Sequence, residues 1–300
     1  MNRRHFFSLS AAAVLPGYSV SSQVSGKRFR KSICDGIVPR SASLEEAFRQ
    51  VKRAGFDGYE ITMGSKLTLE TPPSELKTIA SAARDAGVTI VTISVSRPFS
   101  ECPLNHPDPA VRAKGVEVIK KSVDITSALD GGTILLVPSR VGSGAKLMYG
   151  YEDTWKRTSE ELWKAIPYAA QAKIILTPEN VWNKFLLSPL EMRAFVDQFK
   201  SPWLQTHFDI GNVMQFGFPQ DWISTLGPRI KRIHLKDFKV RANRFVPLME
   251  GDVSWKEVMD ALVKADYRGW LSPEYGYDSS DPEQINKLSA VVDKIYALAA

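Results

Sequence analysis

The sequence predicts an α/β protein built as a single (β/α)8 barrel, and three observations favour this fold. Short runs rich in β-branched residues alternate with longer amphipathic runs, and eight such pairs follow one another. A barrel of this kind needs roughly 250 residues, and the chain has 300. An open doubly wound sheet usually carries a glycine-rich phosphate-binding turn, but the sequence contains neither GxGxxG nor GxxxxGK[ST].

Eight strands and eight helices are expected in strict alternation. The strands are predicted at 32–37, 58–62, 88–94, 133–137, 174–177, 204–208, 230–235 and 270–272. The helices are predicted at 44–54, 74–86, 110–129, 155–172, 190–199, 220–226, 255–265 and 282–298. Nearly continuous apolar strands are typical of parallel strands that are buried on both faces. No shift in composition divides the chain, so one catalytic domain is expected over 28–300.

Residue types at the helix ends support these boundaries. Ser43, Ser188 and Ser254 each precede a glutamate by three residues, which is the spacing of a capping box. Pro189 stands at a first helical position, where no N–H is needed. The stretch 238–251 is longer than a usual strand-to-helix loop. It predicts a short insertion after strand seven, folded over the barrel mouth.

The first 27 residues are predicted to be an export signal and leader. Arg3 and Arg4 precede a small and apolar run at 8–20, and small residues follow at 19–22. Adjacent arginines are typical of the twin-arginine type. The protein is therefore expected to be periplasmic or otherwise extracytoplasmic, and cytoplasmic if the signal is not functional.

The net charge of +6 comes from 39 basic and 33 acidic residues, and it belongs to the leader. Residues 1–31 hold six bases and no acid, so the remainder is neutral. A neutral domain has no overall electrostatic reason to bind nucleic acid. No apolar run of about 18 residues predicts a membrane span. Cys34 and Cys102 are interpreted as unpaired thiols, and the absence of CxxC argues against a cysteine zinc site.

The last four predicted strands each carry a metal-binding side chain at or near their ends. These residues are Glu179, Asp209, His234 and Glu274. In such barrels the catalytic groups lie where strands end, so the four can face one ion. Each residue alone has an ordinary structural explanation, such as a turn cap or an ion pair. Together, three carboxylates and one imidazole predict a site for Mn²⁺, with Mg²⁺ or Co²⁺ as alternatives.

The motifs around these residues also resemble a known family. They are GFDGYE at 55–60, PEN at 178–180, FDIGN at 208–212, HLKD at 234–237, EGDVSW at 250–255 and PEY at 273–275. On these motifs, residues 32–298 resemble the sugar phosphate isomerase/epimerase superfamily, the xylose isomerase-like TIM barrels. The resemblance to its ketose 3-epimerases implies that the four strand-end residues bind Mn²⁺ or a similar ion. It also implies that Glu179 and Glu274 form the acid/base pair.

The chemistry explains why these residue types are needed. A divalent ion bound to a carbonyl and its neighbouring hydroxyl stabilises an enediolate by several kcal/mol. A carboxylate that removes the adjacent proton contributes roughly 10²–10⁴-fold. Return of a proton to the opposite face epimerises that carbon, whereas return to the neighbouring carbon isomerises the sugar. The leading hypothesis is therefore an isomerase or epimerase acting on a small keto sugar.

Two positions depart from the ketose 3-epimerase pattern. Those enzymes have a substrate-binding histidine three residues after the strand-six aspartate, where this chain has Asn212. They have an arginine six residues after the strand-seven histidine, where this chain has Val240. Lys236 and Arg241 are the candidates to act in their place. Further candidates for sugar contacts are Asn212 itself, Trp182 and Asn183, and Glu60, for which a structural ion pair is an equal interpretation.

Other interpretations stay open. The same proton abstraction could end in elimination from a 3-keto glycoside, which would make the protein a lyase. A non-catalytic sugar-binding barrel is the third hypothesis. An endonuclease for damaged DNA would need more histidines and a basic surface. Arg140 after strand four could clamp a phosphate or be solvated, although export argues against phosphorylated substrates. His207 is interpreted as a packed histidine, and a homo-oligomer is possible.

Overall fold

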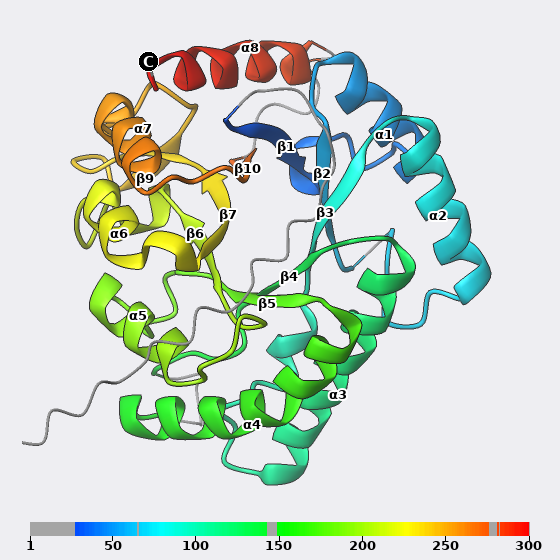
Figure 1. Ribbon diagram of the computed structural model, residues 1–300, viewed down its shortest axis with the longest axis vertical. Coiled ribbons are helices and arrows are strands. Elements are labelled where there is room, and N and C mark those ends of the chain that lie inside the picture. The colour runs from blue at the N-terminus through cyan, green and yellow to red at the C-terminus, as the bar shows by residue number, and fades with distance from the viewer. Residues whose placement is uncertain (1–27, 65, 143–148, 276–280, 282, 300) are drawn as a thin grey trace, which may run out of the picture.

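The computed structural model describes residues 28–64, 66–142, 149–275, 281 and 283–299, so the expected leader lies outside the described residues. The barrel strands are β1 (Arg30–Cys34), β2 (Gly58–Thr62), β3 (Thr89–Ser94), β4 (Thr133–Leu136), β5 (Ile175–Pro178), β6 (Thr206–Asp209), β7 (Ile230–Leu235) and β10 (Trp270–Pro273). The helices are α1 (Leu44–Arg53), α2 (Pro73–Asp85), α3 (Pro109–Ala128), α4 (Tyr151–Ala172), α5 (Pro189–Asp197), α6 (Pro219–Leu226), α7 (Trp255–Lys264) and α8 (Gln284–Ala297). In Figure 1 the helices form an outer ring around the strands, and α8 lies beside α1.

The strands form one parallel sheet that closes on itself. Their order is β5-β4-β3-β2-β1-β10-β7-β6, and every neighbouring pair in this sheet is parallel. The end strands β5 and β6 meet through two isolated bridges, Leu176 with Leu204 and Glu179 with His207. The predicted (β/α)8 barrel is confirmed. At the seam, β5 and β6 are joined by these isolated bridges instead of a named strand ladder.

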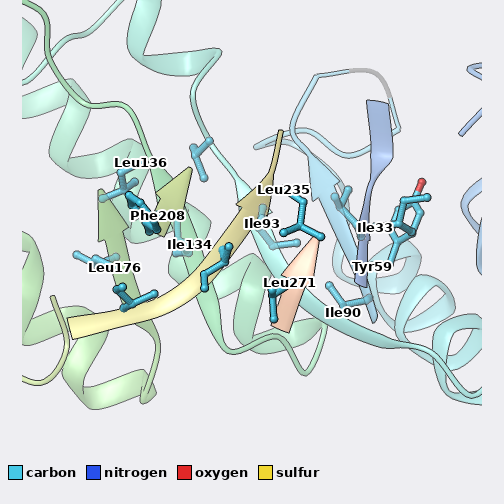
Figure 2. Close-up of a cluster of buried hydrophobic side chains, with 14 of the residues drawn as sticks. Ile33, Tyr59, Ile90, Ile93, Ile134, Leu136, Leu176, Phe208, Leu235 and Leu271 are labelled. Carbon is cyan, nitrogen blue, oxygen red and sulfur yellow. The ribbon is translucent and has the colours of Figure 1, made fainter. Parts of the chain in front are cut away.

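The apolar core lies between the sheet and the helices. Because side chains alternate along a strand, each strand sends one set outward and one inward. Figure 2 shows apolar side chains from all eight barrel strands, among them Ile33, Tyr59, Ile93, Ile134, Leu176, Phe208, Leu235 and Leu271. The alternate positions are largely polar, and they meet inside the barrel. Ser32 and Ser272 share a hydrogen bond of 2.6 Å, and Thr92 and Thr133 one of 2.9 Å.

Two of the three predicted capping boxes form. Ser43 and Ser188 each accept a hydrogen bond from the third helical N–H, and the glutamates bond back. The box predicted at Ser254 is wrong, because Ser254 makes no capping hydrogen bond. The carboxylate of Glu257 instead accepts a hydrogen bond of 2.8 Å from Gln220 Nε2 on the neighbouring helix.

The first strand and the fourth helix differ from their predicted bounds. β1 ends at Cys34, and Asp35–Ile37 form the 3-10 turn η1. The Asp35 carboxylate accepts a 2.6 Å hydrogen bond from the Tyr59 hydroxyl and pairs with Lys66, which draws the chain out of the strand. α4 begins at Tyr151, and the acidic residues in its first turn favour this N-terminus. No described helix is long and apolar enough to cross a membrane, and both cysteines are free and buried.

The predicted insertion after the seventh strand is a small antiparallel hairpin, formed by β8 (Asp237–Lys239) and β9 (Arg244–Val246). Asp237 anchors it and is fully buried. Its carboxylate accepts hydrogen bonds from Phe238 N at 2.9 Å, Met249 N at 2.9 Å, Val253 N at 3.2 Å and Trp255 Nε1 at 3.0 Å. A Cβ added to Gly251 would overlap this carboxylate, so the close approach requires glycine.

We expect Asp237→Ala to destabilise the fold strongly, because it removes the shared acceptor of four N–H groups. Hydrogen bonds to a charged group are valuable, so the free energy of unfolding should fall by about 3 kcal/mol. This loss corresponds to a Tm lower by roughly 6–12 °C. Thermal and urea unfolding would measure it. Asp252→Ala is the control, because its carboxylate accepts one exposed N–H, from Val240 at 2.7 Å. Equal losses in the two variants would contradict the anchoring role.

Candidate active site

Four residues converge at the C-terminal end of the barrel. Glu179 follows β5, Asp209 ends β6, His234 lies in β7 and Glu274 follows β10. One ligand atom from each lies within 4.8 Å of all the others. His234 Nδ1 is 3.1 Å from Glu179 Oε1, 3.2 Å from Glu274 Oε2 and 3.7 Å from Asp209 Oδ2. The structure therefore brings together all four of the side chains that the sequence singles out as metal ligands.

Asn180 fixes Asp209 across the seam of the barrel. Asn180 Nδ2 donates to the Asp209 carbonyl at 2.8 Å, and Asn180 Oδ1 accepts from Asp209 N at 2.8 Å. The side-chain amide thus replaces the backbone bonds that β5 and β6 lack at this level. Asn212 N donates to Asp209 Oδ1 at 2.8 Å, and Asn212 Nδ2 donates to the Asn180 carbonyl at 2.9 Å. The sequence signal for Asn180 is its place directly after a strand-end glutamate.

Glu60 contacts the ring nitrogen of His234 that faces away from the other three carboxylates. His234 Nε2 lies 3.3 Å from Glu60 Oε2 and 3.4 Å from Cys34 Sγ. The other Glu60 oxygen accepts a hydrogen bond from Ser272, which in turn bonds Ser32. A carboxylate on one ring nitrogen directs the other nitrogen towards a metal. Glu60 is 2% exposed and both of its oxygens have partners inside the barrel, which favours the structural interpretation of this residue over a sugar contact.

Burial and charge perturb the titration of the cluster. Burial, together with the Glu274 carboxylate, raises the pKa of Glu179 to about 7. Burial alone would lower the pKa of His234, but Glu274 and the other acidic groups outweigh it and raise that pKa well above its usual value. Burial opposes ionisation of Glu274, yet His234 and Lys236 hold its pKa well below the usual range. The two glutamates are thus pushed in opposite directions.

The residues fit a divalent cation. Asp209 Oδ2 and Glu274 Oε2 are buried oxygens without a hydrogen bond of good geometry within the described residues. Lys236 Nζ lies 2.9 Å from the first and also pairs with the second. A set of three carboxylates and one imidazole is oxygen-rich and suits hard ions. Lys236, predicted as a substrate contact, is therefore placed against two of the candidate metal ligands.

The remaining predicted sugar contacts divide into two groups, and the first consists of Trp182 and Asn183 at the barrel mouth. Trp182 is half exposed at the mouth, where its Nε1 donates to the Asn212 carbonyl at 2.9 Å and its ring stacks on Phe245 of the insertion. Asn183 also lies at the mouth, but its amide donates to Ser139 O and accepts from Phe185 N.

Asn212 and Arg241 form the second group, and as sugar contacts both stay predictions. Asn212 is buried, and its side-chain N–H group serves Asn180. Arg241 lies in the exposed turn between β8 and β9 and makes no hydrogen bond or ion pair within the described chain. His207, as predicted, is packed: its ring centroid lies 4.0 Å from that of His234, and burial lowers its pKa well below the usual value.

Known proteins that resemble this chain in sequence or in fold include xylose isomerase-like barrels and sugar 3-epimerases. A family profile described as xylose isomerase-like TIM barrel matches residues 48–295. A putative L-ribulose-5-phosphate 3-epimerase of Haemophilus influenzae is 27% identical over 256 residues, which cover 81% of this chain and 87% of that protein. An L-ribulose-5-phosphate 3-epimerase of Escherichia coli O1:K1 is 25% identical over 262 residues, 85% of this chain and 90% of that one. A crystal structure of D-psicose 3-epimerase with D-fructose superposes with a TM-score of 0.74 at 22% identity, covering 90% and 100% of the two chains.

We expect Asn180→Ala to loosen the seam beside the candidate site. Two buried backbone groups of Asp209 lose their partners, which costs about 1–3 kcal/mol. Hydrogen exchange would show faster exchange of the Asp209 amide, and urea unfolding would give the loss of stability. Asn286→Ala is the control, because that exposed side chain bonds only its own helix end, at Glu283. Unchanged protection of Asp209 in Asn180→Ala would show that the side chain does not close the seam.

Proposed function

The chain belongs to the xylose isomerase-like TIM barrel family, and we propose that it is a divalent-metal-dependent epimerase or isomerase of a keto sugar. One observation carries the proposal: four ligand atoms from four neighbouring strands lie within 4.8 Å of one another. The names of the curated relatives, which are L-ribulose-5-phosphate 3-epimerases, support the same reaction class.

The metal would be held by Glu179, Asp209, His234 and Glu274. We propose Mn²⁺ as the first choice, with Mg²⁺ and Co²⁺ as alternatives, because the donor set is rich in oxygen. When bound, the cation stabilises the negative charge that develops on the substrate oxygens as a neighbouring proton leaves. Glu60 would keep the imidazole of His234 turned towards that ion, since its carboxylate lies 3.3 Å from Nε2 and can accept the hydrogen of that nitrogen.

Glu179 and Glu274 are proposed as the acid/base pair. They rise from β5 and β10, and β6 and β7 stand between these strands in the barrel. A sugar placed over His234 would therefore have one glutamate on each side. One carboxylate takes the proton next to the carbonyl, and the other returns a proton to the opposite face, which inverts that carbon. Lys236 pairs with Glu274 and holds its carboxylate in place.

Proton exchange in D₂O tests this proposal. Protein without residues 1–27, loaded with Mn²⁺, would be incubated with free ketoses, ketose phosphates, ketose acids and 3-keto glycosides and followed by NMR. Deuterium at C3 with formation of an epimer supports an epimerase, and deuterium at C1 or C2 supports an isomerase. Loss of the glycosidic substituent would indicate elimination instead. Exchange that persists after treatment with EDTA would contradict metal dependence.

Glu179→Gln and Glu274→Gln should each lower the exchange rate by roughly 10²–10⁴-fold, because glutamine cannot carry the proton. The bound metal would be measured in the same samples, which separates loss of the ion from loss of acid/base chemistry. Glu70→Gln is the matched control, because that side chain is 74% exposed on the surface. Wild-type exchange in either site variant would refute the assignment of that glutamate.

We also propose that residues 1–27 direct export through the twin-arginine route. The support is the Arg3-Arg4 pair followed by an apolar run. Replacing both arginines with lysine should keep the protein in the cytoplasm, whereas Lys27→Arg should not alter its location. Cell fractionation with immunoblotting measures the distribution. An unchanged distribution in the double-lysine variant would contradict this route.

A further inference from the structure

A cavity of about 470 Å³ lies among the loops at the barrel mouth, and the residues that line it do not include the four converging residues themselves. Its walls come from the segments that follow β3, β4 and β5. One wall begins at Val181, two residues after Glu179. Two residues of chain span at most about 7 Å, so this wall begins close to the backbone of a proposed catalytic glutamate. A substrate that reaches Glu179 can therefore extend into the cavity.

The cavity is positively charged. Arg140 and Lys184 both line it, and no aspartate or glutamate does so among the described residues. Neither cation forms an ion pair or a side-chain hydrogen bond within the described part of the chain. The carboxylates of the candidate site belong to β5, β6, β7 and β10 instead. The mouth thus has an acidic half and a basic half.

The basic half is built by two interlocked loops. The Arg140 carbonyl accepts a 2.6 Å hydrogen bond from the buried side chain of Asn105. The next residue, Val141, donates its N–H to Asn183 O at 2.9 Å, and Asn183 Nδ2 donates to Ser139 O at 2.9 Å. These bonds join the loop after β4 to the loop after β5. They hold the backbones that carry Arg140 and Lys184 next to one another.

Lys184 adopts an uncommon backbone conformation. Its φ is +60°, in the left-handed region that non-glycine residues seldom enter. The side chain runs over Gly142, where an added Cβ would lie 3.7 Å from Lys184 Nζ. Seven other described non-glycine residues also have a positive φ, so the value alone does not mark a functional site. Here the conformation brings the ammonium group to the same cavity as the guanidinium of Arg140.

We propose that this cavity binds an anionic group at the end of the substrate remote from the reacting carbon, so that the substrate is a keto sugar with a terminal phosphate or carboxylate. The inference rests on the proposed function and names its substrate class. A neutral sugar offers these two exposed cations only hydroxyl acceptors, which water replaces readily. With an anion they form charge-assisted hydrogen bonds, and the guanidinium can bind either group through two parallel N–H donors.

Matched substrates test the inference. Exchange would be measured with the Mn²⁺-loaded protein on D-ribulose against D-ribulose 5-phosphate, and on D-fructose against D-fructuronate. For at least one pair, kcat/KM for the anionic sugar should be more than ten times kcat/KM for its neutral partner. The pair with the larger ratio shows whether the cavity prefers phosphate or carboxylate. In the double variant Arg140→Ala/Lys184→Ala that ratio should be close to one, mainly because KM for the anionic sugar rises. Lys121→Ala, on the exposed face of α3, should keep it.

Binding of inorganic phosphate gives a second readout that does not depend on turnover. Calorimetry on metal-free protein should detect phosphate binding that is weakened at least tenfold in the double alanine variant and in Arg140→Gln. Circular dichroism would confirm that the variants are folded. A neutral sugar used as well as its anionic partner, or a ratio unchanged by the double variant, would overturn the inference while leaving the proposed function intact. If no sugar exchanges at all, the proposed function fails, and absent phosphate binding would then overturn the inference separately.

Discussion

The convergence of four carboxylates, three of them buried, around one imidazole is the constraint on which the site depends. Glu60, Glu179, Asp209 and Glu274 surround His234, and Lys236 is the only other cation in direct contact with them among the described residues. With all four acids ionised, four acids and two bases leave two negative charges without compensation, and the raised pKa of Glu179, about 7, reflects the cost of burying such charge. A divalent cation would offset that imbalance. The same imbalance that disfavours the empty cluster therefore favours metal binding.

The interior of the barrel is lined by polar side chains, which can accommodate these charged groups. Barrels of this fold usually fill the interior with layers of branched apolar side chains. Here the inward positions include Ser32, Thr92, Thr133 and Ser272, which bond one another across the strands. The apolar core is displaced to the layer under the helices (Figure 2). This polar interior supplies the serine that holds Glu60, and hence the orientation of His234, so the site is supported from inside the barrel.

The sequence predicts the fold and the four converging residues because both follow from local pattern. Alternation of strand and helix defines the barrel, and in a parallel barrel every strand end reaches the same face. The position of Glu60 depends instead on which side of β2 faces inward, and a strand end that is uncertain by one residue reverses that side. Asn180 and Asn212 hold Asp209 through bonds across the seam, which no spacing along the chain reveals. Arg241 lies on a hairpin whose direction is set by the anchoring of Asp237.

A basic cavity beside an acidic cluster would give the substrate a single direction. Val181 and Trp182 link the two, so an anion held by Arg140 and Lys184 would place the sugar chain past Glu179 and over His234. Glu274 would then always meet the far face. Stereospecific inversion requires that each carboxylate meets one fixed face of the reacting carbon, and anchoring a remote group is an effective way to secure this. Phosphate would agree with the names of the curated relatives, whereas a carboxylate would agree with the proposed export. Both would impose the same orientation, because the guanidinium binds the two groups alike.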